Sequence, residues 1–211
     1  YLRSHVSASD VVGGEHPVGT GDRMEFLTLL EQAAEDHRSR VAVDEALRRR
    51  TCEVLPAGGM AARTRAMLKV EDGCVNFCTY CIVPFTRGRQ KSRDAGAILD
   101  ECRALIDNGA KEITLLGQNV NSYGLDKHAS GDTSFARLLR QVSELPGLAR
   151  LRFVTPHPKD LSPEVIAMFG EVPNLCPRLH LPLQAGSDRV LARMNRKYDM
   201  ARYMTLVEGL R

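Results

Sequence analysis

Apolar residues alternate along residues 63–211 between short continuous runs and longer segments with helical spacing. The runs predict strands at 66–70, 112–116, 150–154 and 178–183. The spaced segments predict helices at 94–108, 134–145, 162–169 and 199–210, and a further one capped by Ser187. Strand-then-helix units in series predict an α/β fold with a parallel sheet and right-handed crossovers.

This pattern is compatible with a doubly wound sheet or with part of a barrel, and the spacing alone does not separate them. In either architecture the ligand site lies at the carboxyl ends of the strands. Three polar clusters follow predicted strands and are expected at that edge: residues 71–85, 116–124 and 181–187.

Residues 1–62 are patterned differently. The segment 24–30 follows Gly-Thr-Gly-Asp and predicts a turn and then a helix. Residues 31–62 are charged and alanine-rich, and then contain Pro and Gly. We therefore expect an amino-terminal segment (1–30), a connection (31–62) and a main domain (63–211).

Composition adds little to this prediction. The chain is 43% hydrophobic and 26% charged, which is typical of a globular protein with a core. Its first thirty residues carry charges throughout, and no apolar run approaches the roughly 18 residues of a spanning helix. These features agree with a cytoplasmic enzyme but do not identify one, and nothing in them indicates membrane association or export.

Three cysteines carry the most specific chemical information. Cys74, Cys78 and Cys81 form a Cys-x3-Cys-x2-Cys triplet, and three thiolates on one loop can hold three irons of a 4Fe-4S cluster. The fourth iron would then be open to a small molecule. Structural zinc prefers four ligands, and no second half-site with suitable spacing follows. A zinc-containing RNA-binding module without catalysis is the alternative from another class.

The remaining cysteines have other interpretations. Cys102 falls between Ile98 and Leu105 at helical spacing, so we expect a packed core thiol. Cys52 and Cys176 stand alone and are interpreted as buried or loop thiols. A disulfide framework is disfavoured because such frameworks belong to short secreted domains.

The triplet, with Tyr80 just before its last cysteine, resembles the signature of radical S-adenosylmethionine (radical SAM) enzymes. The wider segments 63–74 and 82–93 resemble the methylthiotransferase branch of that family, and the resemblance covers residues 63–211. It implies a partial (β/α)6 barrel, preceded by the tail of an amino-terminal methylthiotransferase domain. It also implies that the open iron binds S-adenosylmethionine, with the backbone of Tyr80 near the adenine.

The same resemblance implies further cofactor contacts. The loop after the second strand, with Gly117, Gln118 and Asn119, would bind the amino group of the methionine moiety. The region after the fourth strand, with Gln184 and Ser187, would approach the ribose.

The segment 155–160, Thr-Pro-His-Pro-Lys-Asp, also resembles a motif of this family. Its His157 could face the substrate, but an exposed loop histidine between prolines is the preferred interpretation.

Basic residues are concentrated between 47 and 93, although the net charge of the chain is only +3. For Arg48 to Arg50, a solvent-exposed surface without a binding partner is a sufficient interpretation. Another basic group adjoins the triplet and is predicted to contact RNA phosphates, positioning the RNA without reading its sequence: Arg87, Arg89, Lys91 and Arg93.

The resemblance also implies that a full-length family member has three domains. The first binds a second 4Fe-4S cluster, the second is the radical SAM barrel, and the last is a small β-barrel that binds RNA. The chain begins at Tyr1 and ends inside a predicted helix, so we expect a fragment with one cluster, the second belonging to the full-length protein only. An electron donor is expected as a partner, and a monomer as the oligomeric state.

Three substrate classes are known for this family: isopentenyl-adenosine in tRNA, threonylcarbamoyl-adenosine in tRNA, and an aspartate of a ribosomal protein. The segments 117–123, 155–160 and 180–187 resemble the isopentenyl-adenosine branch, whereas the Arg-Gly-Arg at 87–89 leans toward the threonylcarbamoyl branch. The resemblance therefore implies insertion of a methylthio group at carbon 2 of isopentenyl-adenosine beside the anticodon. A 5′-deoxyadenosyl radical derived from S-adenosylmethionine would activate that carbon.

Overall fold

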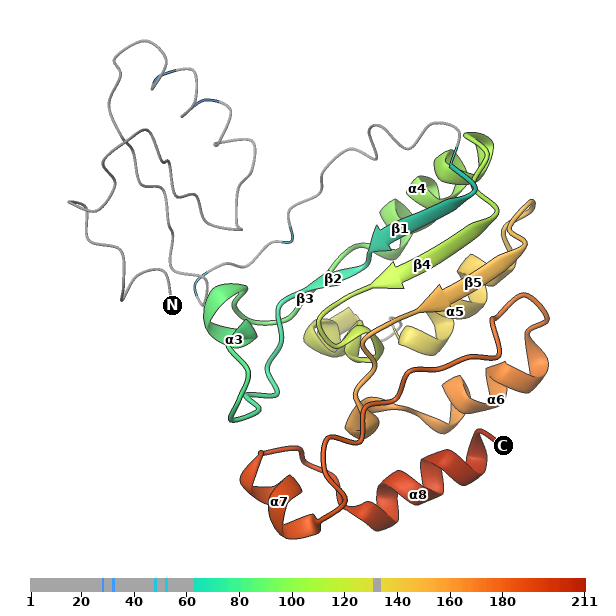
Figure 1. Ribbon diagram of the computed structural model, residues 1–211. Coiled ribbons are helices and arrows are strands. Elements are labelled where there is room, and N and C mark those ends of the chain that lie inside the picture. The colour runs from blue at the N-terminus through green and yellow to red at the C-terminus, as the bar shows by residue number, and fades with distance from the viewer. Residues whose placement is uncertain (1–27, 29–31, 33–47, 49–51, 53–62, 131–133) are drawn as a thin grey trace.

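The computed structural model describes residues 63–130 and 134–211, with isolated positions at 28, 32, 48 and 52. Apart from those positions, the predicted helix at 24–30 and the connection at 31–62 lie outside the described residues. At the centre is a parallel sheet of three strands in the order β1-β4-β5 (Figure 1). The strands are β1 (Arg65–Lys69), β4 (Glu112–Leu116) and β5 (Arg150–Phe153).

The two faces of this sheet differ because side chains alternate along each strand. One face is buried and carries Ala66, Leu68, Ile113, Leu115, Leu151 and Phe153. On the opposite face Met67 is 67% exposed, and Thr114 and Arg152 are partly exposed. The apolar core therefore lies on one side of the sheet only.

Three helices pack on the buried face (Figure 1). They are α4 (Ala95–Asp107), α5 (Phe135–Ser143) and α6 (Pro163–Glu171). Each begins after a capping side chain that accepts a hydrogen bond from the first turn, namely Asp94, Ser134 and Ser162. These three predicted helices are confirmed.

Helices on one face and strands in chain order distinguish this sheet from a doubly wound one, which carries helices on both faces. The prediction of a partial barrel is confirmed. The core prediction for Cys102 is confirmed too, since this residue of α4 is fully buried, and burial raises the pKa of its thiol to about 12.

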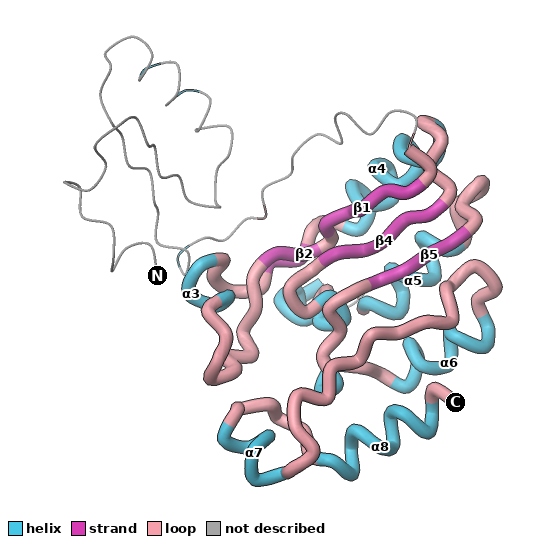
Figure 2. Tube along the Cα trace, in the orientation of Figure 1, coloured by secondary structure: helices cyan, strands magenta, loops and turns pink. Residues whose placement is uncertain are grey.

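The predicted fourth strand at 178–183 is wrong. The chain makes a single parallel bridge, between Leu175 and Leu151, and then continues without strand pairing through the predicted range. Pro177 and Pro182 have no backbone N–H to donate to a ladder, which explains why pairing with β5 stops after one bridge. This irregular segment runs beside β5 in Figure 2.

Two helices follow that segment, α7 (Asp188–Arg193) and α8 (Met200–Gly209). Asp199 caps α8 by accepting a hydrogen bond from the Arg202 N–H at 2.7 Å. Ser187 occupies the predicted N-cap position of α7, but its side chain makes no capping hydrogen bond.

Several short elements beyond the strands were not predicted. An antiparallel pair, β2 (Glu71–Asp72) and β3 (Lys91–Ser92), encloses the one-turn helix α3 (Val83–Thr86). Three 3-10 turns follow: η2 (Val120–Ser122) and η3 (Leu125–Ser130) after β4, and η4 (Pro158–Asp160) after β5. These elements shape the edge where the site is expected.

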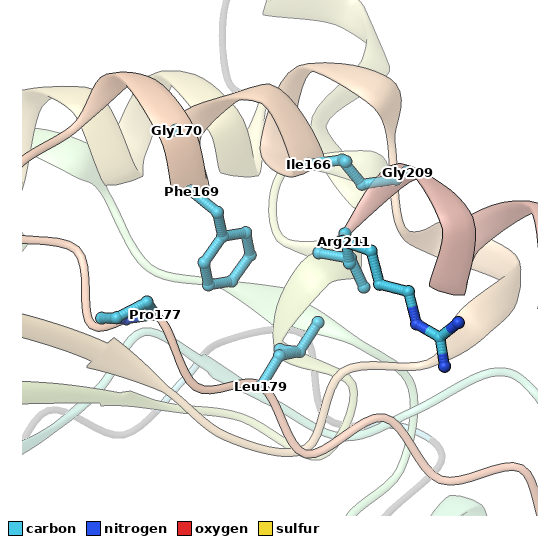
Figure 3. Close-up of a pocket in the computed structure, with 8 residues that line it drawn as sticks. Ile166, Phe169, Gly170, Pro177, Leu179, Gly209 and Arg211 are labelled. Carbon is cyan, nitrogen blue, oxygen red and sulfur yellow. The ribbon is translucent and has the colours of Figure 1, made fainter.

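A cavity lies between α6, the irregular segment and α8, lined by Ile166, Phe169, Leu179 and Arg211 among others (Figure 3). Its lining is apolar except for Arg211 and contains none of the predicted site residues. None of the helices in the described part of the chain is long and apolar enough to cross a membrane.

Candidate metal centre at the carboxyl ends of the strands

Residues 73–90 form a loop between β2 and β3 that carries all three cysteines of the triplet, and we call it the cysteine loop. Its first residue, Gly73, has φ +84°, and a Cβ there would lie 2.2 Å from the carbonyl oxygen of Arg89. Cys74 N–H donates to the Gly88 carbonyl at 3.1 Å. The two ends of the loop therefore approach so closely that a side chain at position 73 has no room.

Gln118, from the turn after β4, fastens this loop to the sheet. Its Oε1 accepts a hydrogen bond from Gly73 N–H at 2.6 Å. The predicted cofactor contact at Gln118 therefore already has a structural partner at the base of the cysteine loop.

The three thiols of the loop are free and face different environments. Cys78 is buried, whereas Cys74 and Cys81 are partly exposed. Burial raises the pKa of the Cys74 thiol, the Asn76 N–H opposes that shift, and the charges of Glu71, Cys78 and Cys81 raise the pKa further. Within the described ranges, no three His, Cys, Asp or Glu side chains already converge as a metal site.

A segment more than a hundred residues away holds the cysteine loop from the other side. Thr79 N–H donates to the Met194 carbonyl at 3.2 Å. Asn195 Nδ2 donates to the carbonyls of Asn76 and Phe77 at 3.1 and 2.9 Å. Sequence reasoning missed this contact, although an asparagine directly after a helix is a signal for a left-handed helix end.

Tyr80, predicted near the adenine, is half exposed, and its hydroxyl accepts a hydrogen bond from Arg196 Nη1 at 3.1 Å. The same Nη1 lies 3.4 Å from Cys78 Sγ. Arg196 was not among the predicted site residues, because a single arginine after a helix has no distinctive sequence signal.

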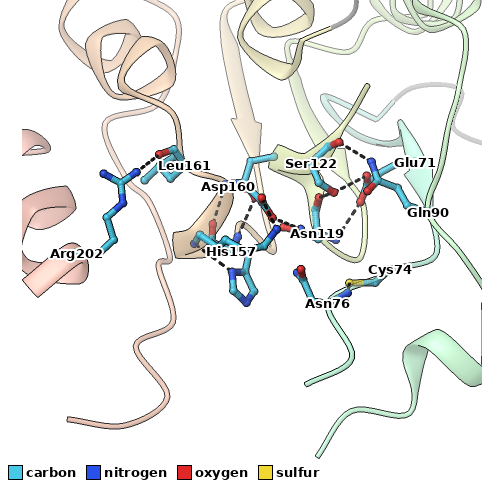
Figure 4. Close-up of polar contacts among 12 residues, drawn as sticks. Glu71, Cys74, Asn76, Gln90, Asn119, Ser122, His157, Asp160, Leu161 and Arg202 are labelled. Atoms are coloured by element: carbon cyan, nitrogen blue, oxygen red, sulfur yellow. Dashed lines mark hydrogen bonds and ion pairs between the residues drawn. The ribbon is translucent and has the colours of Figure 1, made fainter. Parts of the chain in front are cut away.

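A buried polar network connects the start of the cysteine loop to the turn after β4 (Figure 4). Glu71 accepts a hydrogen bond from Asn119 N–H at 3.0 Å and contacts Ser122 Oγ at 3.3 Å. Ser122 Oγ donates its own hydrogen to the Asn119 carbonyl at 2.7 Å. Burial raises the pKa of Glu71 to about 8, so the carboxyl is protonated at neutral pH and can donate to Ser122 Oγ.

Gly117 and Asn119, both predicted cofactor contacts, belong to the same network. A Cβ at Gly117 would lie 2.5 Å from the Glu71 side chain, so glycine is needed for this close approach. Asn119 is buried, and its Nδ2 donates to Asp160 at 2.7 Å while its Oδ1 is left without a hydrogen-bond partner. That free acceptor is the part of Asn119 available to a ligand.

The preferred interpretation of His157 as an exposed loop residue is wrong, because it is 6% exposed. Burial first, and then the charge of Arg196, lower its pKa to about 4, so the imidazole is neutral. Its Nδ1 accepts from Lys159 N–H at 3.1 Å, which places the ring proton on Nε2. Nε2 is a buried hydrogen-bond donor that no group in the described ranges satisfies.

The stretch predicted to contact RNA is only partly accessible. Arg93 is buried, forms an ion pair with Glu101 and donates a hydrogen bond to the Lys69 carbonyl. Lys91 is also buried, and its Nζ donates a hydrogen bond to the Arg87 carbonyl at 2.9 Å. Arg89 is exposed, and Arg87 is partly exposed while contacting Asp72 at 3.4 Å. Residues 90–93 are all buried where β3 pairs with β2, so the exposed and partly exposed basic side chains of this stretch are Arg89 and Arg87.

The remaining predicted contacts lie on the loop before α7. Gln184 is exposed and has φ +71°, and Ser187 is exposed at the start of the helix. The Tyr198 hydroxyl donates to the neighbouring Leu183 carbonyl at 2.8 Å, which ties this loop to the Arg196 region.

Comparison with known proteins defines the class. The family model of the Radical SAM superfamily matches residues 68–211, and this chain belongs to that superfamily. The cofactors characteristic of the superfamily are a 4Fe-4S cluster and S-adenosylmethionine. Three soft, free thiols on one loop are a suitable donor set for such a cluster.

Curated relatives narrow the comparison. The chain is 66% identical over 154 residues to the tRNA-2-methylthio-N(6)-dimethylallyladenosine synthase of Nitratidesulfovibrio vulgaris, covering 73% of this chain and 34% of that protein. It is 46% identical over 210 residues to the enzyme of the same name from Geobacter metallireducens, covering 100% and 46% respectively. The chain therefore spans less than half the length of these relatives.

Solved structures with similar folds are also radical SAM enzymes. The methyltransferase TsrM from Kitasatospora setae, solved with tryptophan and a SAM analog, has a TM-score of 0.59 at 16% identity, covering 92% of this chain and 42% of that one. The cobalamin-dependent enzyme OxsB has a TM-score of 0.53 at 13% identity, covering 68% and 22%. At these identities the likeness supports the fold alone.

Proposed function

We propose that this chain is the radical SAM core of a tRNA methylthiotransferase that inserts a methylthio group at carbon 2 of isopentenyl-adenosine beside the anticodon. The observation that carries the proposal is the 66% identity to a synthase named for this product, over the part of the chain that contains the cysteine loop. In this proposal residues 63–211 are the radical SAM core, 1–30 the tail of an amino-terminal domain and 31–62 the connection.

The cysteine loop provides the metal ligands in this proposal. Cys74, Cys78 and Cys81 hold three irons of a 4Fe-4S cluster and leave the fourth for S-adenosylmethionine. When bound, the cluster supplies the electron that cleaves the sulfonium bond of that cofactor. The loop is suited to this role because hydrogen bonds between Gly73 and Gln118, and from Asn195 to Asn76 and Phe77, fix the segment that leads to Cys78.

The groups facing this loop orient the cofactor and the base. Asn119 Oδ1 offers an acceptor, and Asn76 Nδ2 and His157 Nε2 offer donors, all buried and without a protein partner. A buried polar group without a partner is costly unless a ligand satisfies it. These atoms are therefore suitable contacts for the polar edges of S-adenosylmethionine and adenine. Gln184 and Ser187 stay as proposed ribose contacts.

RNA binding is assigned to the exposed side of the same loop. Arg87 and Arg89 are proposed to contact tRNA phosphates near the cluster. The proposal also includes a partner protein or molecule that donates an electron to the cluster. The protein is proposed to be a monomer in the cytoplasm, in keeping with a tRNA substrate.

The experiment is modification of tRNA by the native-length protein, reconstituted anaerobically with iron, sulfide and S-adenosylmethionine. The substrate is offered as isopentenylated tRNA in one reaction and as threonylcarbamoylated tRNA in another, and the nucleosides are identified by mass spectrometry. We expect the methylthio derivative of the isopentenylated nucleoside alone.

A matched control carries Cys74→Ala and is expected to form no product. Product from the threonylcarbamoylated tRNA alone would replace the proposed substrate. Zinc in place of iron, with tRNA binding but no product, would support the non-catalytic RNA-binding module instead.

A further inference from the structure

We propose that Arg196 is a positioning residue for the cluster: its guanidinium donates a hydrogen bond to the sulfur of Cys78 and raises the reduction potential of the cluster. This inference rests on the proposed role of the cysteine triplet. It adds a residue outside the triplet motif that controls how easily the cluster accepts its electron.

The guanidinium is buried and held rigidly. Arg196 is 4% exposed, and its Nη1 lies 3.4 Å from Cys78 Sγ and 3.1 Å from the Tyr80 hydroxyl. Its Nε donates to the Tyr198 hydroxyl at 3.2 Å, and its central carbon lies 5.2 Å from the centre of the Tyr198 ring. Three aromatic or sulfur side chains thus fix the direction in which the donors point.

The backbone at Arg196 is fixed as well. Asn195 has φ +56°, and the N–H groups of Asn195 and Arg196 donate to the carbonyls of Ala192 and Leu191 at 3.0 Å each. These two bonds form a Schellman motif that ends α7. Because the Asn195 side chain also binds the cysteine loop, the helix end and the loop form one unit that carries Arg196 to Cys78.

The charge balance around Arg196 supports a role beyond packing. In the described part of the chain, Arg196 makes no ion pair, and its hydrogen-bond partners are a thiol and two tyrosine hydroxyls. Among the described residues, its Nη2 has no hydrogen-bond partner either. A buried cation without an anion is strongly unfavourable. Thiolate ligands of a cluster at Cys78 would supply the missing negative charge.

The effect on electron transfer follows from electrostatics. Reduction adds one negative charge to the cluster and its thiolates. A fixed cation that donates to a ligating sulfur stabilises the reduced form more than the oxidised form, which raises the reduction potential. Arginine is suited to this role because it stays protonated and presents its donors in a rigid plane.

The test compares three variants of the native-length protein: Arg196→Met, Arg196→Lys and the control Arg193→Met, which removes an exposed arginine of α7. Iron and sulfide contents are measured first. The midpoint potential is then determined by anaerobic titration monitored by electron paramagnetic resonance. We expect a more negative potential for Arg196→Met, an intermediate value for Arg196→Lys, and an unchanged value for Arg193→Met.

An Arg196→Met protein with full iron content and the wild-type potential would overturn the inference. If Arg196→Met loses its iron, Arg196→Lys decides the question: a lowered potential supports the inference, and a wild-type potential overturns it. Failure of the proposed function is seen separately, because the wild-type protein would then form no methylthio product from isopentenylated tRNA.

Discussion

The parallel sheet and the cysteine loop are stabilised in different ways. The sheet and its helices α4, α5 and α6 share a continuous apolar core on one face. The cysteine loop is instead held by directional hydrogen bonds from residues distant in sequence, Gln118 on one side and Asn195 and Arg196 on the other. The sheet tolerates small geometric errors, whereas the loop depends on a few individual contacts.

The largest contrast is expected between cysteines of the two regions. Replacing Cys74, Cys78 or Cys81 with Ala removes a proposed cluster ligand, so we expect loss of the iron bound at the loop with the fold retained. Cys102→Ala changes a buried residue of α4 and is expected to lower the free energy of unfolding by about 1 kcal/mol or more while iron stays bound. Iron-to-protein ratios and urea unfolding of each variant measure both effects, with Cys176→Ala as a second iron-retaining control. Loss of iron in a folded Cys102→Ala protein would overturn the ligand assignment.

Glycines provide a second contrast. Gly73→Ala puts a methyl group 2.2 Å from the Arg89 carbonyl oxygen at a φ of +84°. Left-handed backbone alone disfavours alanine by about 1–2 kcal/mol, and the steric overlap adds to this. We expect the base of the loop to open and most iron to be lost.

The matched control is Gly170→Ala in α6, where an added Cβ meets nothing within 4 Å. Alanine favours a helix by about 1 kcal/mol over glycine, so this variant is expected to be at least as stable as the wild type. Iron content and thermal unfolding distinguish the two. Equal iron content in both variants would show that the loop tolerates rearrangement at Gly73.

Exposed arginines give a smaller contrast. Replacing Arg87 and Arg89 together with Gln is expected to weaken tRNA binding and to reduce the slope of log affinity against log salt by about two units, because roughly one unit is lost for each phosphate contact. Arg103→Gln, an exposed arginine of α4, is the control and is expected to leave the slope unchanged. Binding measured over a salt series tests this, and an unchanged slope in the double variant would exclude phosphate contacts at the loop.

The smallest expected effect lies where the two regions join, at Glu71. Its folded-state pKa of about 8 is above the ordinary 4.5, so the folded protein retains a proton that the unfolded chain releases between these values. Stability from this group is present below about pH 4.5 and is lost as the pH rises toward 8. Glu71→Gln mimics the protonated acid and should remove this dependence. Urea unfolding at pH 6, 7 and 8 should show the wild type losing stability relative to Glu71→Gln, and parallel profiles would contradict the shifted pKa.

The same two regions differ in how well the sequence predicts them. The positions of β1, β4, β5, α4, α5 and α6 follow from apolar periodicity, since this is a local signal. The prediction of a fourth strand is wrong because Pro177 and Pro182 cannot donate backbone hydrogen bonds, although the residues between them include an apolar run. Inside the site, the triplet is visible as spacing, but the contacts of Gln118, Glu71 and Arg196 are not. They depend on residues 45 to 118 positions apart, which no periodicity encodes.

The central claim is that three cysteines of the loop hold a cluster with one iron open to S-adenosylmethionine. Mössbauer spectroscopy of the reconstituted, 57Fe-labelled protein tests it directly. The account predicts that adding S-adenosylmethionine changes the signal of one iron in four and leaves the other three unchanged. Four irons that do not respond to S-adenosylmethionine, or an iron-free protein that holds zinc, would contradict it.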